Sequence, residues 1–276
     1  MRLFFLCLFL IFISQPLKGQ STIVYLENMV ESISSIKTLE YEFHGIEAID
    51  NKMFHTHSIV KLQKDPFSFY NYIIEPDRGI EILFTSENDY AIINPNGFPF
   101  INLKLNPYGR LIRRNQHHTL FEAGFDNVKN VVLSIIELLR KSPEKYIVNL
   151  GVNKINNKEC QVLKVINPDF TFLEYIVKEG ENIESIATKF NLSSYLILVE
   201  NNLNFYNDIS FGDTIQIPNS YAEEFEVWID LDSNLPIVQK IFVNHKLFEH
   251  YEFNNIIINP KFSIDEFDQN NLEYNF

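Results

Sequence analysis

Two histidines lie two residues apart, a spacing that can serve metal binding. Side chains at positions i and i+2 of a β-strand point to the same face, so His55 and His57 could share a metal ion with a third ligand. The neighbours Lys52, Met53 and Thr56 place the pair next to a predicted hairpin turn. No carboxylate or cysteine follows at a diagnostic interval, so we expect no metal site and no cofactor.

The other candidate bases and nucleophiles also lack partners in the sequence. His117 and His118 are adjacent, and adjacent residues of a regular helix or strand point apart, so a packing or capping role is expected. His245 and His250 straddle a predicted turn and its following strand, with no nucleophile nearby. Cys160 lies in the strand-like run E-C-Q-V-L-K-V, which predicts a small buried side chain rather than a reactive thiol.

A glycosidase would need two carboxylates with separated pKa values. Because the chain holds 36 Asp and Glu residues, composition does not exclude such a pair. The candidates are Glu122, Asp126, Asp230 and Asp232. No H-x-x-E-H zinc helix, G-x-S-x-G elbow or phosphate-binding glycine loop is present. We therefore expect that the protein is not an enzyme.

Hydrophobic periodicity predicts that these residues are carried by an antiparallel sheet with two packing helices, which is the α+β class. Apolar residues recur at helical spacing from Ser21 to Leu39 and from Phe121 to Arg140. Strand-like alternation occurs in the segments 40–46, 58–62, 67–74, 80–84, 90–93, 100–103, 146–150, 162–166, 225–230, 235–243 and 247–258.

The segment 175–218 has the clearest local pattern. A β-prone run ends at Gly180, a helical pattern follows, Ser193 is a predicted N-cap of a second helix, and an alternating run closes at Pro218. The predicted order is β-α-α-β. With its GD-x-L-x-x-I-A-like start and its L-x-x-G-x-x-L-x-I-P-like end, the segment closely resembles the LysM module, except that Glu181 stands where Asp is usual and Ile183 where Leu is usual.

The LysM resemblance implies non-catalytic binding of glycans that contain N-acetylglucosamine, such as peptidoglycan. It places the glycan in a shallow groove with a free face between two loops, lined by Gly180, Glu181, Asn182 and Ile183 on one side and Asn204, Phe205, Asn207, Asp208 and Ile209 on the other. Backbone amides and carboxamides would bind the acetamido group, and an apolar side chain would pack on its methyl. The alternative is a module that no longer binds glycan and acts as a spacer.

A second resemblance covers most of residues 30–276. The runs R-G-I-E-I-L-F, N-L-K-L-N-P-Y-G-R-L and E-V-W-I-D-L-D-S-N-L-P-I, the pair His117-His118 before F-E-A-G-F, and the C-terminal Y-E-F-N-N-I-x-I-N-P-K-F resemble an uncharacterised family of exported bacterial proteins. That family is similar in outline to LolA/LolB-type lipoprotein carriers, in which a curved, unclosed antiparallel sheet wraps an apolar cavity.

The second resemblance implies a discontinuous β domain of residues 21–171 and 221–276, interrupted by the LysM-like module of residues 172–220. A lipid or lipoprotein acyl chain is then an alternative partner. Most aromatic residues are expected in the core, while some would line the cavity. These aromatic candidates are Phe67, Phe69, Tyr70, Tyr72, Phe98, Phe100, Phe121, Phe125, Phe242, Phe248 and Phe253.

The first 20 residues predict a signal peptide. Met1-Arg2 precedes an apolar run from Leu3 to Ile13 that is too short to span a bilayer comfortably, with cleavage expected near Gly19 or Gln20. An uncleaved N-terminal anchor is the alternative. Cys7 lies inside the apolar run, so no lipidated cysteine is expected. The formal charge of −13 argues against nucleic acid and anionic membrane surfaces as partners.

Taken together, the sequence predicts an exported peptidoglycan-binding protein of the periplasm or cell envelope. The alternative is a carrier or sensor of a lipid or lipoprotein acyl chain that is tethered to the wall by the module. A cell-wall hydrolase is the third alternative.

Overall fold

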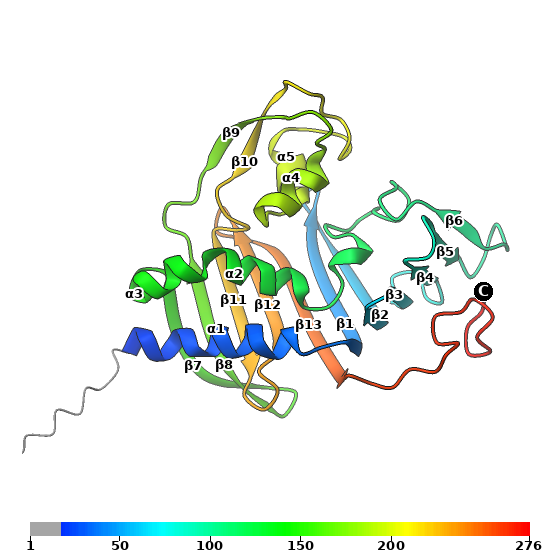
Figure 1. Ribbon diagram of the computed structural model, residues 1–276, viewed down its shortest axis with the longest axis horizontal. Coiled ribbons are helices and arrows are strands. Elements are labelled where there is room, and N and C mark those ends of the chain that lie inside the picture. The colour runs from blue at the N-terminus through cyan, green and yellow to red at the C-terminus, as the bar shows by residue number, and fades with distance from the viewer. Residues whose placement is uncertain (1–17) are drawn as a thin grey trace, which may run out of the picture.

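The computed structural model describes residues 18–276 (Figure 1). The predicted signal peptide, residues 1–20, lies outside the described residues except for its last three, which begin the first helix. The helices are α1 (Lys18–Ser34), η1 (Leu120–Glu122, a 3-10 turn), α2 (Asp126–Lys141), α3 (Pro143–Tyr146), α4 (Ile183–Phe190) and α5 (Ser194–Glu200). The strands are β1 (Thr38–Ile49), β2 (Lys52–Lys64), β3 (Phe67–Glu75), β4 (Glu81–Thr85), β5 (Ala91–Asn94), β6 (Leu103–Leu105), β7 (Ile147–Ile155), β8 (Lys158–Ile166), β9 (Phe172–Ile176), β10 (Thr214–Pro218), β11 (Glu224–Asp230), β12 (Pro236–Val243) and β13 (Lys246–Ile258).

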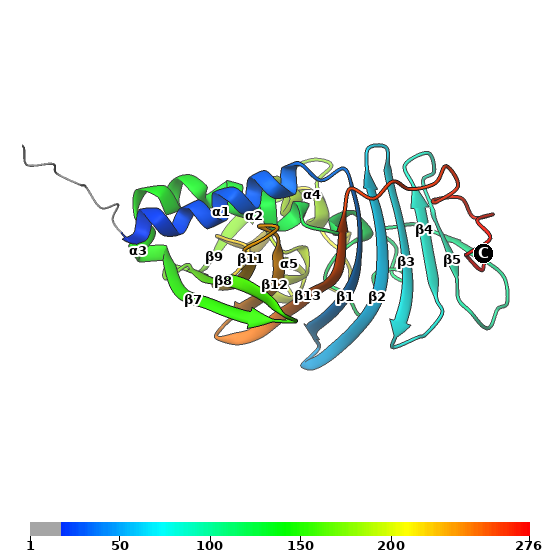
Figure 2. The same ribbon diagram turned by 90° about the horizontal axis from the view of Figure 1, so that it is seen from below.

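One antiparallel sheet of 11 strands forms the scaffold. Its strand order is β6-β5-β4-β3-β2-β1-β13-β12-β11-β8-β7, and the edge strands β6 and β7 do not pair with each other. The sheet curves along its length, as Figure 2 shows. The predicted α+β class with a curved, unclosed antiparallel sheet is therefore confirmed.

A two-residue turn sets the register at the centre of this sheet. Asp50 and Asn51 connect β1 to β2 with φ angles of 49° and 62°, the left-handed values that tight hairpins require. Ile49 consequently pairs with Lys52, and every later pair along the two strands follows from that contact.

Two helices cover one face of the sheet over the β7 to β13 half (Figure 1). In α1 the residues Leu26, Met29 and Ile33 are fully buried at helical spacing. Helix α1 ends at Ser34 rather than at the predicted Leu39, because β1 already begins at Thr38. No helix in the described part of the chain is both long and apolar enough to cross a bilayer.

Helix α2 buries Val128, Val132, Ile136 and Leu139 on one face. It begins at Asp126 rather than at the predicted Phe121. The preceding segment forms the 3-10 turn η1, and Gly124 then takes a φ angle of 82°, which is incompatible with a continuous helix.

The predicted module is inserted within the large sheet. Strands β8 and β11 pair with each other, with Ile166 opposite Glu224, yet β9, α4, α5 and β10 lie between them in sequence. The connections leave the sheet side by side and are joined by Asn167, whose backbone N–H donates to Glu223 O at 2.8 Å and whose side chain donates to Ser220 Oγ at 2.9 Å.

The module has its own small core and also packs on the sheet. Its core consists of Val177, Ile183, Ile186, Ala187, Leu192, Ile197, Tyr206, Ile215 and Ile217. Tyr195 and Leu196 of α5 instead belong to the main core, and the Tyr195 ring stacks on His117 with centroids 4.1 Å apart.

The C-terminal segment packs back on the β2 to β4 part of the sheet. Tyr274 stacks on Tyr70 with ring centroids 3.9 Å apart, and the backbone N–H of Asn275 donates to the buried Glu81 carboxylate at 3.1 Å.

Candidate functional site

The module's loops are positioned by helix caps. The Asn182 side chain accepts a hydrogen bond from Ser185 N at 2.9 Å and so fixes the start of α4. Asn191 ends α4 in the left-handed conformation. Ser193 caps α5 through Leu196 N at 3.2 Å, which confirms its predicted N-cap role.

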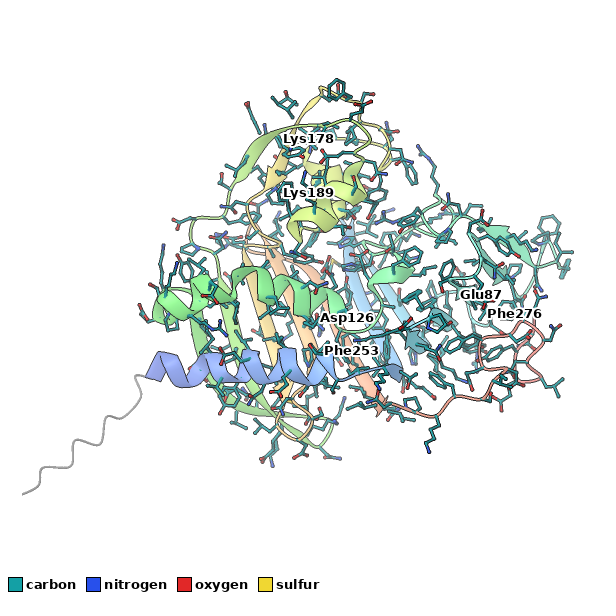
Figure 3. All side chains as sticks on the ribbon, in the orientation of Figure 1. Glu87, Asp126, Lys178, Lys189, Phe253 and Phe276 are labelled. Atoms are coloured by element: carbon teal, nitrogen blue, oxygen red, sulfur yellow. The ribbon has the colours of Figure 1, made fainter. Side chains whose placement is uncertain are left out.

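Two main-chain hydrogen bonds hold the predicted glycan-binding loops beside each other. Ile183 N donates to Tyr206 O at 3.1 Å, and Val177 N donates to Asp213 O at 2.9 Å. The loop at Lys178 lies at the end of the module away from the large sheet (Figure 3). The structure therefore leaves solvent access to this end of the module.

The nine predicted contact residues differ in exposure. Gly180, Asn204, Asn207 and Asp208 are exposed, and Glu181, Asn182, Phe205 and Ile209 are half-buried. The ninth residue, Ile183, has a fully buried side chain in the module core. Its side chain points into the module core, because the apolar face of α4 turns inward.

The Glu181 carboxylate is already bound within the module. It accepts hydrogen bonds from Lys189 Nζ at 2.8 Å, Lys178 N at 3.0 Å and the Tyr175 hydroxyl at 2.8 Å. These bonds, that from Lys189 foremost, lower the pKa of Glu181 to about 2. Glu181 therefore fixes the loop shape while remaining charged.

Phe211 is an exposed apolar residue that the sequence reasoning did not assign to the site. Its side chain is 75% exposed. Phe211 precedes Gly212, whose N–H donates to Val177 O at 3.0 Å, so the main chain of this turn lies beside the end of β9. The sequence feature that could have pointed to Phe211 is an aromatic residue at the first position of the predicted F-G-D turn.

The second loop also borders the large sheet. A polar cavity of about 540 Å³ lies between residues 202–206 and the segment 110–116. There Arg110 stands over the Phe205 ring at 4.4 Å and Arg113 over the Tyr206 ring at 3.5 Å. The Phe205 side of the groove is therefore partly closed by the segment 110–116, which follows β6.

A second candidate site is an apolar cavity of about 520 Å³ between α2 and the sheet. Its size falls within the range of ligand-binding pockets, roughly 300–1,000 Å³. Of the predicted aromatic residues, Phe69 and Phe253 line it. Other lining side chains are Tyr41, Phe43, Val60, Val128, Val131, Val132, Ile135, Leu138, Phe225 and Ile241.

A polar cluster with a fully buried centre, here called the inner cluster, lies at this cavity and comprises His117, His118, Glu122, Tyr221 and Glu249. Glu249 is fully buried, and its carboxylate faces His117 Nδ1 at 2.8 Å and the Tyr221 hydroxyl at 3.1 Å. His118 faces Glu122 at 3.0 Å and Glu249 at 3.5 Å. The adjacent histidines therefore share Glu249 instead of pointing apart, because residues 117 and 118 lie outside regular helix or strand.

The inner cluster is charged. Burial alone would raise the pKa of Glu249, but His118 and His117 outweigh it and lower the pKa to about 2. Burial would lower the pKa of His118, but the Glu122 and Glu249 carboxylates raise it well above its ordinary value. At neutral pH the cluster therefore holds a protonated His118 between two carboxylates.

The remaining candidate carboxylates serve ion pairs or turns. Asp126 binds Lys64 at 2.6 Å, and Asp230 binds Lys158 at 2.9 Å and Ser233 at 2.6 Å. Asp232 is exposed in the turn that follows β11.

The other residues named in the sequence analysis are buried, paired with a carboxylate or exposed. Cys160 is fully buried in β8, and burial raises the pKa of its thiol to about 11, which confirms the packing role. His245 and His250 pair with glutamates on or beside their strands. His55 is exposed, while His57 lies against Glu42 of β1 at 2.6 Å.

Two family models match neighbouring parts of the chain. The LysM domain model matches residues 175–218, and the model of a protein of unknown function, DUF1571, matches residues 36–172. The search of curated proteins finds no match to this chain.

Solved structures are similar over most of the chain at low identity. The lipoprotein LppX from Mycobacterium tuberculosis is 8% identical with a TM-score of 0.44, covering 89% of this chain and 99% of that one. A LolA superfamily protein from Nitrosomonas europaea is 11% identical with a TM-score of 0.31, covering 91% and 97%. A lipoprotein-sorting protein domain from Vibrio parahaemolyticus is 10% identical with a TM-score of 0.35, covering 92% and 98%. On the two family matches, the chain contains a LysM domain that follows a DUF1571 region.

Proposed function

We propose that this protein is an exported, non-catalytic binder of peptidoglycan or another glycan that contains N-acetylglucosamine, and that the LysM domain is its binding module. The observation that carries the proposal is the pair of adjoining, solvent-accessible loops at the end of a complete β-α-α-β module. The match of residues 175–218 to the LysM domain model supports this proposal.

The proposed contacts divide between the two loops. Gly180 takes a φ angle of 77° with no other atoms near the position of a Cβ, so a sugar can approach its backbone closely. Asn204, Asn207 and Asp208 offer polar groups to the acetamido nitrogen and oxygen. The exposed Phe211 ring provides an apolar surface for a sugar face.

Sedimentation with purified peptidoglycan sacculi tests this proposal. The variant Asn207→Ala/Phe211→Ala removes one polar and one apolar contact, and we expect binding about tenfold weaker, a loss typical of central contact residues. Soluble chitin oligomers should compete with the wild-type protein for the sacculi.

A matched control carries Phe98→Ala and Asn102→Ala, two exposed residues of the β5–β6 loop outside the module. This control should sediment like the wild-type protein. Equal sedimentation of all three proteins would overturn the proposal.

A second candidate function is favoured by the cavity. A mainly apolar, partly open cavity of about 520 Å³ beside a charged cluster suits an amphipathic ligand such as a lipid or a lipoprotein acyl chain. In this function the module holds the carrier or sensor at the wall.

Displacement of a fluorescent fatty acid tests the cavity. Val131→Trp places a large ring on the lining and should weaken binding about tenfold, whereas Leu133→Trp on the exposed side of the same helix should not. Absence of probe binding to the wild-type protein, together with no lipid in a solvent extract, would remove this function and leave glycan binding untouched.

A further inference from the structure

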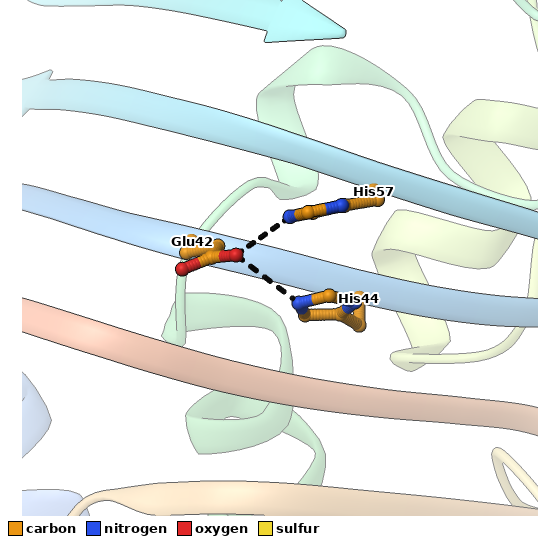
Figure 4. Close-up of side chains that lie close together, drawn as sticks. All are labelled: Glu42, His44 and His57. Atoms are coloured by element: carbon orange, nitrogen blue, oxygen red, sulfur yellow. Dashed lines mark hydrogen bonds and ion pairs between the residues drawn. The ribbon is translucent and has the colours of Figure 1, made fainter. Parts of the chain in front are cut away.

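The face of the sheet opposite the cavity carries a cluster of different character. Along β1, Tyr41, Phe43 and Gly45 line the cavity, so the alternating residues Glu42 and His44 point to the opposite face. His57 of β2 is the direct cross-strand partner of His44. We call Glu42, His44 and His57 the outer cluster (Figure 4).

We propose that the outer cluster is a binding site for a divalent transition-metal ion of the Zn²⁺ class. Two imidazoles and one carboxylate form the ligand set of many zinc sites, with further positions left for water. Among residues 18–276 no other group of three His, Cys, Asp or Glu side chains brings its ligand atoms within 4.8 Å of one another.

The ligand atoms already converge. Glu42 Oε1 lies 3.4 Å from His44 Nε2 and 2.6 Å from His57 Nε2 (Figure 4). Ligand atoms bound at about 2.0–2.2 Å to a tetrahedral zinc ion are separated by roughly 3.3 Å. The 3.4 Å separation between Glu42 Oε1 and His44 Nε2 fits such an ion. The 2.6 Å separation between Glu42 Oε1 and His57 Nε2 must lengthen to roughly 3.3 Å when the ion binds.

Both histidine rings present Nε2 to the same oxygen of Glu42. They stack with centroids 4.0 Å apart and planes inclined by 21°, so each ring must tilt toward the other for the two lone pairs to meet at one ion. Two neighbouring imidazolium ions would repel each other, whereas two neutral rings can both donate a lone pair to one cation.

Surrounding residues orient and attract the ion. Asn255 Nδ2 donates to the other oxygen of Glu42 at 2.6 Å, which leaves Oε1 facing the histidines. In the same cross-strand row, Glu75 of β3 pairs with His57 and Glu252 of β13 pairs with His44, so two more carboxylates flank the rings.

The site is accessible without a conformational change. The side chains of Glu42, His44 and His57 are 27%, 42% and 22% exposed. All three residues are held by the paired central strands of the sheet, which fix ligand positions better than loops do. An ion can thus enter from solvent on the face away from the cavity and the glycan-binding loops.

Zinc titration into the tag-free, chelator-treated full-length protein tests the site. Isothermal titration calorimetry should show one Zn²⁺ per chain, and His57→Ala and Glu42→Gln should each weaken binding at least about tenfold. His55→Ala, on the same strand but outside the outer cluster, should bind like the wild-type protein.

Nitrogen ligation gives an independent readout. Electron paramagnetic resonance of bound Cu²⁺ should show coupling to imidazole nitrogen in the wild-type protein and lose it in a His44→Ala/His57→Ala variant. Circular dichroism of that variant should be unchanged, because both side chains are partly exposed. Zinc binding that is equal in wild type and in the double variant, or absent in both, would overturn the proposal.

Discussion

The inner and outer clusters both join glutamate to histidine, but their central carboxylates differ in exposure. In the inner cluster Glu249 is fully buried between His117, His118 and Tyr221. In the outer cluster Glu42 is 27% exposed, and His44 and His57 are 42% and 22% exposed. Burial thus commits the first set to internal charge pairing, while exposure leaves the second set free to exchange its internal contacts for a ligand.

The largest expected effect follows from removing the buried charge. Glu249→Gln leaves the protonated His118 with one carboxylate fewer in a buried site, so we expect a loss of about 3–5 kcal/mol in the free energy of unfolding. Urea denaturation measures it. A loss below about 1 kcal/mol would contradict the inference that burial makes the inner cluster more important for stability than the outer cluster.

The pH dependence of stability sharpens the same comparison. The pKa of Glu249 falls from an ordinary 4.5 to about 2 on folding, so its contribution is present above pH 4.5 and is lost as the pH falls through 2. The corresponding stabilisation is about 3 kcal/mol. The raised pKa of His118 acts in the other direction: its contribution is complete below pH 6.5 and is lost as the pH rises through the folded-state pKa.

Urea denaturation at pH 6, 4 and 3 checks the acid branch. The wild-type protein should lose more stability over this range than Glu249→Gln, because the variant lacks the titrating carboxylate. Parallel losses in both proteins would place the acid sensitivity in other carboxylates.

A smaller effect is expected where the inner cluster meets the LysM domain. The buried Arg113 guanidinium donates to His117 O at 2.7 Å and also contacts Ser194 and Glu184 of the domain. Arg113→Met keeps the apolar stem but removes these bonds, so we expect a loss of about 2 kcal/mol. Hydrogen exchange should become faster in α4 and α5, and unchanged exchange would mean that the domain is held by apolar packing alone.

The smallest effect is expected in the outer cluster. Without metal, Glu42→Gln should change the free energy of unfolding by less than about 1 kcal/mol, because the carboxylate is partly exposed and its ion pairs are weak. Urea denaturation in the presence of a chelator measures it. A loss as large as that of Glu249→Gln would make the outer cluster structural.

The elements of the LysM domain could be predicted well because their signals are local. The helical spacing predicted α4 from Ile183, and Ser193 was identified as the cap of α5. The burial of Ile183 was the exception among the contact residues, since a residue at the first turn of an amphipathic helix faces the core when its spacing matches the apolar face.

The outer cluster was missed because the sequence search paired His57 with His55. The true partners come from the neighbouring strand. The Asp50-Asn51 turn carried the needed signal, because a two-residue hairpin turn there places His44 directly opposite His57. The inner cluster had no comparable signal, since His117 lies in an irregular segment and meets Glu249 of β13, which is 132 residues away in sequence.

The side-by-side attachment of the LysM domain has a mechanical consequence. Both of its connections leave from the Ile166–Glu224 end of the β8–β11 pair. Tension applied through an anchored polymer would therefore reach β8 and β11 together and pull both strands lengthwise, so the ladders that join them to β7 and β12 would share the load. The Asn167 bonds to Glu223 and Ser220 would hold the two connections together under that load. Lengthwise loading strains many rungs at once, so the joint would resist force without separating the strand pair.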